Sequence, residues 1–68
     1  MINTIRVERA KLNISQGELA GKVKVSRQTI HSIETSKFVP SVALALKIAK
    51  FFDTKVDDIF TLEESDLV

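Results

Sequence analysis

Residues 16–34 read Gln-Gly-Glu-Leu-Ala-Gly-Lys-Val-Lys-Val-Ser-Arg-Gln-Thr-Ile-His-Ser-Ile-Glu, and they contain the most informative structural pattern of the chain. It follows Ser15, which together with Glu18 makes a capping box, a pattern typical of a helix start. Apolar residues then recur at helical spacing as far as Val23, and Ser26 is a second N-cap residue. The stretch therefore predicts two helices of about eight residues, separated by a link of about three.

A link this short prevents the two helices from lying antiparallel, so they must cross steeply in a helix-turn-helix arrangement. The residues expected to lock the pair together are apolar: Leu19, Ala20, Val23, Val25, Ile30 and Ile33. The residues left outside on the second helix are polar: Arg27, Gln28, His31 and Ser32. Arginine matches guanine O6 and N7, and glutamine matches adenine N6 and N7. This outer side therefore predicts contact with DNA bases.

The rest of the chain also has helical patterns with short breaks. A first helix is expected to end near Leu12, with Asn13 in the left-handed conformation that asparagine tolerates. Pro40 closes a loop, a fourth helix covers residues 42–52, and a short fifth helix holds Ile59 and Phe60. The sequence thus predicts one all-α domain of five helices over residues 1–68, with residues 61–68 as a short acidic tail.

Composition argues against several functional classes. The chain has no cysteine and a single histidine, which leaves neither a disulfide nor a protein-only metal cage. No nucleophile, metal cage or phosphate loop is recognisable, so we expect no enzyme activity and no cofactor. No small-molecule ligand is evident either. The longest apolar run is far short of the roughly 20 residues that span a membrane. With no signal peptide recognisable, we expect a cytoplasmic protein.

Charge is unevenly distributed along the chain. Residues 1–37 hold seven basic and three acidic side chains, a net charge of +4, whereas residues 38–68 hold three basic and six acidic ones, a net charge of −3. With such a division, the basic half can attract a polyanion while the acidic half repels it. Ordinary scatter of surface charge explains the same numbers equally well.

The chain resembles the Cro/CI-type helix-turn-helix family, to which the lambdoid phage repressors belong. The likeness runs from about residue 5 to about residue 60 and includes short members that are single-domain repressors. Six motifs carry it: Ser15-Gln16-x-Glu18-Leu19-Ala20, Val25-Ser26-Arg27-Gln28-Thr29-Ile30, Ile33-Glu34, Pro40-Ser41, Leu46-Lys47-Ile48-Ala49 and Asp58-Ile59-Phe60. The resemblance implies a lambda-repressor-like fold of five helices and a function in transcription regulation.

The resemblance also implies roles for individual residues. Those at base-reading positions are Arg27, Gln28 and Ser32. Those at backbone or flanking positions are Gln16, Ser26, Thr29, His31 and Lys37, with Gln16 expected on a phosphate. Arg9 and Glu34 match positions that form a partly buried ion pair. The chain departs from the family in two places: Lys24 replaces a turn glycine, and Thr35-Ser36 replaces Asn-Gly. A positive φ at Lys24 costs roughly 1–2 kcal/mol, so we expect either a different turn or tolerated strain.

We expect a homodimeric repressor that binds double-stranded DNA at an inverted repeat. A domain of this size gains little stability from one core, which favours association. The residues expected at the interface are in the C-terminal part: Phe51, Ile59, Phe60 and Leu62. Leu44 and Phe51 fit either the core or an exposed stripe for a partner. The alternative function is a protein-binding module, such as the antitoxin of a toxin pair, in which DNA binding is secondary.

Overall fold

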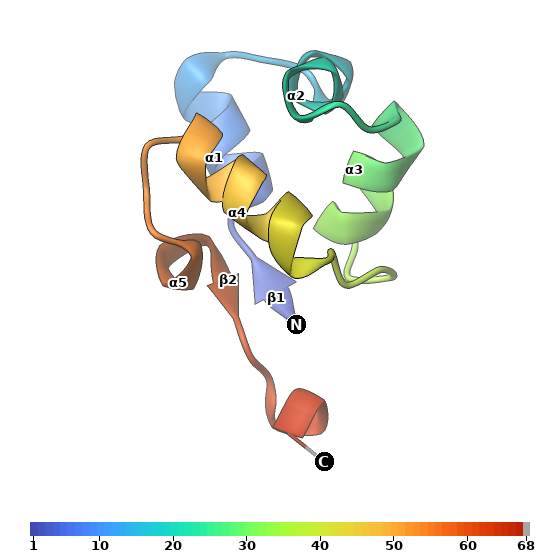
Figure 1. Cartoon of the computed structure of the whole chain (residues 1–68), viewed down its shortest axis with the longest axis vertical. Coiled ribbons are helices and arrows are strands. Elements are labelled where there is room, and N and C mark those ends of the chain that lie inside the picture. The colour runs from blue at the N-terminus through green and yellow to red at the C-terminus, as the bar shows by residue number, and fades with distance from the viewer. Residues whose placement is uncertain (68) are drawn as a thin grey trace.

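The computed structural model describes residues 1–67 and has five α-helices wrapped around one apolar core (Figure 1). The helices are α1 (Ile5–Leu12), α2 (Gln16–Val23), α3 (Arg27–Glu34), α4 (Val42–Phe51) and α5 (Val56–Ile59). The predicted all-α class and the five helices are confirmed. Between Met1 and Leu67, no helix has the length and apolar character that a membrane crossing requires.

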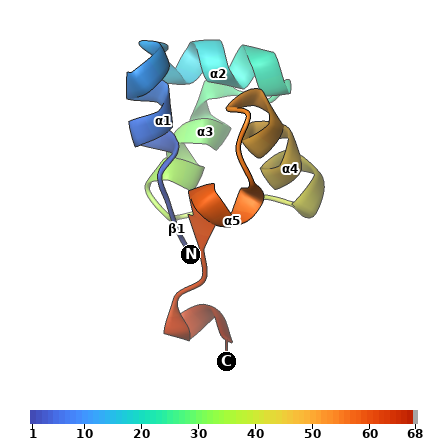
Figure 2. The same ribbon diagram turned by 90° about the vertical axis from the view of Figure 1, so that its left-hand side faces the viewer.

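Two short strands, which the sequence patterns do not indicate, close the domain below the helices. β1 (Ile2–Asn3) pairs antiparallel with β2 (Phe60–Thr61), with Asn3 opposite Phe60. The strands bring the two ends of the fold together, and the chain then leaves the helical body (Figures 1 and 2). The predicted tail begins with Thr61 of β2 and contains a 3₁₀ turn, η1 (Glu64–Leu67). Val68, the last residue of the predicted tail, lies outside the described residues.

The core takes at least one fully buried side chain from every helix. These are large aliphatic residues: Ile5, Leu19, Ile30, Ile33, Ile48 and Ile59. The set predicted to lock α2 to α3 lies inward, with Val25 only half-buried at the core's edge. Burying a side chain of this kind contributes about 1.5–3 kcal/mol, so these few residues account for much of the stability of so small a domain.

The link between α2 and α3 places Lys24 in the left-handed region, with φ 60° and ψ 48°. Of the two outcomes expected here, the structure has the strained residue. Its conformation lets the Lys24 and Val25 amides both donate to the Ala20 carbonyl, which ends α2. Asn13 ends α1 in the same conformation, as predicted, with φ 55°. The two positions hold α2 between abrupt turns.

The structure corrects the expected subunit interface for two residues. Ile59 is 1% exposed and Phe60 9% exposed within their own chain, because β1 and the helices cover them. Ile59 therefore has almost no surface to offer to a second chain, and Phe60 has only the small part that lines a hollow beside Val42 and Leu62. Phe51 is half-buried and packs edge-on against Phe52, with ring centroids 5.1 Å apart, whereas Leu62 remains exposed. Leu44 belongs to the core.

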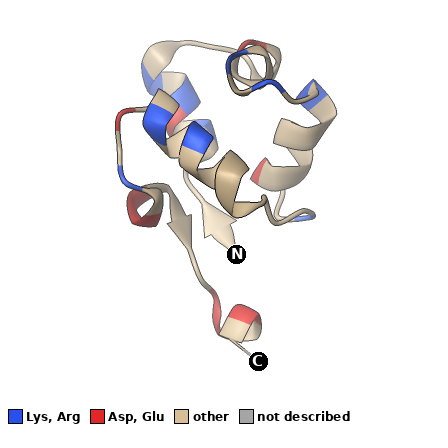
Figure 3. Ribbon diagram, viewed as in Figure 1, with Lys and Arg blue, Asp and Glu red and all other residues tan. Residues whose placement is uncertain are grey.

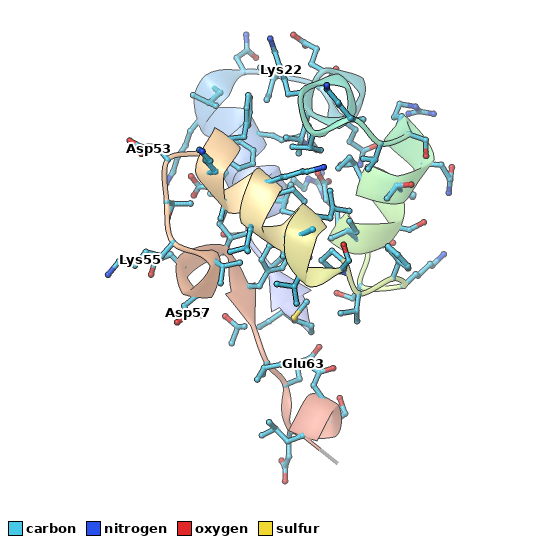
Figure 4. All side chains as sticks on the ribbon, in the orientation of Figure 1. Lys22, Asp53, Lys55, Asp57 and Glu63 are labelled. Carbon is cyan, nitrogen blue, oxygen red and sulfur yellow. The ribbon has the colours of Figure 1, made fainter. Side chains whose placement is uncertain are left out.

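The charges gather at different parts of the fold. Acidic side chains occupy the α4–α5 turn and α5, where Asp53 and Asp57 are marked in Figure 4 on the side away from α3. Others lie in the tail below the helices, where Glu63 pairs with the Met1 ammonium. Basic residues are spread over α1, α2, α4, the start of α3 and the loops at Lys37 and Lys55 (Figure 3). The surface around α3 therefore stays free of the acidic cluster.

Candidate nucleic-acid interface

Two serine caps fix where α2 and α3 begin. Ser15 Oγ accepts from the Glu18 amide at 3.0 Å, while Glu18 Oε1 accepts from the Ser15 amide at 3.1 Å, completing the predicted capping box. Ser26 Oγ accepts from the Thr29 amide at 3.1 Å and lies 2.9 Å from the Thr29 hydroxyl. These hydrogen bonds satisfy amides that the helices leave open and so define both helix starts.

The exposed side of α3 carries the residues predicted to read bases. Arg27, Gln28 and His31 are all exposed, and His31 follows the other two by four and three residues, which places them on one side of the helix. We call these three residues, with Gln16 of α2, the α2–α3 face. Ser32 is only half-buried, and its carbonyl accepts from the amides of the loop at Lys37 and Phe38.

The start of α2 lies against the start of α3. A Cβ added to Gly17 would lie 3.8 Å from Arg27 Cδ, so the aliphatic stem of Arg27 passes directly over this glycine. A hollow opens beside the stem, between α1, α2 and α3. It is lined by Arg6, Arg9, Gln16, Arg27, His31, Glu34 and Thr35. Three guanidinium groups against one carboxylate give this hollow a positive character suited to an anion.

Arg9 and Glu34 join α1 to α3 at the inner wall of the hollow. Arg9 Nε donates to Glu34 Oε2 at 2.7 Å, and its Nη2 donates to Oε1 at 3.0 Å, a two-pronged ion pair. The remaining prong, Nη1, donates to the Ile14 carbonyl at 3.0 Å. The two side chains are 15% and 6% exposed, respectively, so the pair is largely shielded from water.

The pairing shifts the titration of both groups. Burial alone would raise the pKa of Glu34, but hydrogen bonds from Arg9 and Gln16 outweigh burial and hold that pKa below its usual value. The hydrogen bond to Glu34 raises the pKa of Arg9 further. Glu34 therefore remains ionised at neutral pH, and the only carboxylate of α3 is neutralised by its partner.

Gln16 extends this network from the ion pair to the exposed side of α3. Its Nε2 donates to Glu34 Oε1 at 3.1 Å and lies 3.3 Å from Nδ1 of His31. No sequence pattern links Gln16 to His31, because the contact depends on how steeply α2 crosses α3. The sequence therefore singled out both residues without indicating that they touch.

The remaining predicted site residues surround the α2–α3 face. Ser26 and Thr29 lie at the N-terminus of α3, where their hydroxyls bond to each other. Lys37 is exposed in the loop after α3, and this loop passes through Ser36 at φ 61°. The Thr35 hydroxyl donates to the His31 carbonyl at 2.9 Å and caps the end of α3. The replacement of Asn-Gly by Thr35-Ser36 thus keeps a left-handed residue in the loop.

Comparison with known proteins agrees with this geometry. The model of the family described as Helix-turn-helix matches residues 5–59. A protein of Methanocaldococcus jannaschii named as an uncharacterized HTH-type transcriptional regulator is 50% identical over 97% of this chain and all of its own length. Similarly named proteins of Archaeoglobus fulgidus and Bacillus subtilis are each 46% identical, over 98% and 97% of this chain and 94% and 100% of their own. With its steeply crossed α2 and α3, the chain belongs to the helix-turn-helix family.

Proposed function

We propose that this protein is a DNA-binding transcription regulator, a repressor that reads base edges with Arg27 and Gln28 of α3. The observation that carries the proposal is the exposure of these two residues, side by side, at the start of a helix that is anchored on its other side. Within residues 1–67, Arg27 forms no salt bridge, so its planar donor fork is available to a guanine. Ser32, half-buried, is the third proposed base contact.

Backbone contacts are proposed for the residues around these base readers. Lys37 after α3 and the hydroxyls of Ser26 and Thr29 border the α2–α3 face and are suited to phosphate oxygens. Such contacts fix the position of the protein on the duplex without selecting a sequence. The positive hollow beside α3 and the distance of the acidic cluster from it support this orientation.

We further propose that two copies associate through an apolar surface on the α4 side. Val39, Val42, Leu46 and Leu62 are all more than half exposed, and together with Pro40 they line one apolar hollow. In this proposed interface Leu62 is retained, Ile59 is left out because it is buried, and Phe60 lines the hollow but is mostly covered by its own chain. A two-fold dimer that spans one turn of DNA presents two α3 helices about 34 Å apart, which predicts an inverted-repeat operator. Occupancy of such an operator is sufficient to repress a promoter that overlaps it.

The experiment is fluorescence anisotropy with labelled DNA from upstream of the gene, compared with scrambled DNA at the same salt concentration. We expect Arg27→Ala and Gln28→Ala each to weaken specific binding by about 1–3 kcal/mol and to relax preference at one base position. Arg27→Lys keeps the charge and removes the fork. Lys55→Ala is the control for lost charge, because Lys55 is exposed far from α3 (Figure 4). Unchanged affinity and unchanged base preference in both alanine variants would contradict the proposal.

A further inference from the structure

The amide nitrogen of Gln16 lies within hydrogen-bond distance of two acceptor atoms of the protein. An amide nitrogen carries two hydrogens and no acceptor. Glu34 Oε1, at 3.1 Å, takes one of them. His31 Nδ1, at 3.3 Å from the same nitrogen, is close enough to accept the other. Gln16 is therefore committed to the protein side of the α2–α3 face and has no donor left for DNA in this arrangement.

The contact with Gln16 selects one form of the His31 ring. Because the amide nitrogen can only donate, the contact is a hydrogen bond only when Nδ1 has no proton. A neutral imidazole then carries its proton on Nε2. The second nitrogen of His31 is thus a donor, on an exposed side chain one helical turn beyond Arg27.

The direction of the Gln16 amide is itself imposed by the ion pair. If the amide turned over, its oxygen would face the Glu34 carboxylate, and two acceptors repel. Glu34 in turn is held by two hydrogen bonds from Arg9, at 2.7 and 3.0 Å. Arg9 therefore orients Glu34, Glu34 orients the Gln16 amide, and the amide orients His31. Contacts of this kind fix histidine tautomers in other sites.

We propose that neutral His31 donates from Nε2 to a hydrogen-bond acceptor of bound DNA, and that Gln16 is the residue that positions it. The proposal rests on the proposed DNA-binding function and revises the expectation that Gln16 itself donates to a phosphate. The acceptor is a base-edge oxygen or nitrogen or a phosphate oxygen, all of which take an N–H donor. His31 thereby becomes a third donor on the α2–α3 face, after Arg27 and Gln28.

Nitrogen NMR of the imidazole tests the arrangement without DNA. In alkaline buffer we expect the wild-type ring to show an unprotonated Nδ1 and a protonated Nε2. Gln16→Glu places a carboxylate acceptor beside Nδ1 and is expected to move the proton to Nδ1. Gln16→Met, which is similar in length, provides neither a donor nor an acceptor and is expected to give a mixture of the two tautomers. It serves as the test variant if Gln16→Glu does not fold. A wild-type ring protonated at Nδ1, or tautomer populations that are the same in all variants, overturns the proposal.

Operator affinities of single and double variants distinguish a Gln16 that positions His31 from a Gln16 that contacts DNA itself. We expect Gln16→Met and His31→Ala each to weaken operator binding about 3- to 10-fold, the effect of one hydrogen bond. If Gln16 acts through His31, the double variant binds no more weakly than His31→Ala alone. The proposal is overturned if the double variant loses affinity by the product of the two single losses, or if His31→Ala binds with full affinity. A wild-type protein that binds no DNA overturns the proposed function instead, and the NMR result stands apart from it.

The chemistry of the acceptor is decided on modified DNA. Replacing single phosphates by uncharged methylphosphonates removes one acceptor oxygen at each linkage. If the loss caused by His31→Ala disappears at one modified linkage, the acceptor is that phosphate. If the loss is the same at every modified linkage, the acceptor is a base edge. Both results support donation from Nε2 and differ only in where the acceptor lies.

Discussion

Removal of the shielded Glu34 carboxylate is expected to destabilise the protein more than removal of an exposed carboxylate does. Glu34→Ala leaves the Arg9 guanidinium, only 15% exposed, without its carboxylate, and it also removes the acceptor of Gln16. Breaking a fully buried pair costs roughly 3–5 kcal/mol, and exposed pairs contribute about 0–1 kcal/mol. This pair lies between the two limits and closer to the buried one, so we expect a loss of about 2–4 kcal/mol in the free energy of unfolding.

Thermal unfolding followed by circular dichroism measures this loss. In a domain of 60–100 residues, each kcal/mol lowers Tm by about 4–8 °C, so Glu34→Ala is expected to melt about 8–30 °C below wild type. Glu64→Ala removes an exposed carboxylate from the tail and is the control, with an expected change near zero. A double-mutant cycle with Arg9→Leu isolates the coupling between the two side chains. Melting of Glu34→Ala within a degree or two of wild type would refute the argument from burial.

The dependence of stability on pH provides a second test of the same pair. The pKa of Glu34 in the folded protein is below its ordinary value of 4.5. A lowered pKa contributes stability that is fully present above about pH 4.5 and is lost as pH falls through the folded-state pKa. Wild-type stability is therefore expected to decline in acid below that point. Glu34→Gln, which cannot ionise, should lack this part of the decline.

Three further predictions concern other parts of the molecule. Lys24→Gly relieves a positive φ and should raise stability by about 0.5–1 kcal/mol, whereas Lys22→Gly in the last turn of α2 should lower it by about the same amount, as calorimetry would show. Leu46→Glu should give a monomer in sedimentation equilibrium at micromolar concentration, and Leu12→Glu, at similar exposure on α1, should leave the dimer intact; a wild-type monomer would contradict this. Lys37→Ala should weaken binding to all sequences alike and reduce the slope of log affinity against log salt by about 1.

The parts of the fold that short-range patterns determine could be predicted from the sequence. Ser15 and Ser26 are cap residues whose hydroxyls act on amides three positions away, so local spacing specifies where α2 and α3 begin. The same holds for Asn13, whose tolerance of the left-handed conformation belongs to the residue itself. Periodicity likewise identified the inward side of α3, where Ile30 and Ile33 are buried.

The parts that depend on tertiary placement could not be predicted. β1 and β2 have two residues each and lie more than fifty positions apart, so no periodic pattern in the sequence indicates them. The burial of Phe60 follows from their pairing. Phe60 was expected at a subunit interface because an apolar residue near a chain end fits either location. The 3.3 Å contact between Gln16 and His31 joins residues fifteen positions apart and requires the crossing geometry itself.

The charges of the hollow explain why neutral donors are useful at its rim. On the face proposed to meet DNA, a carboxylate repels phosphates, so Glu34 there requires a compensating positive charge. Arg9 supplies this charge with two direct hydrogen bonds, and the pair has little net field beyond its immediate neighbours. Gln16 and His31 then extend the network outward without adding a carboxylate or a fixed charge. If DNA covers this face as proposed, exclusion of water weakens screening and strengthens the electrostatic contacts of this network. We therefore expect the ion pair, the amide and the imidazole to hold one another more firmly when DNA occupies the proposed face.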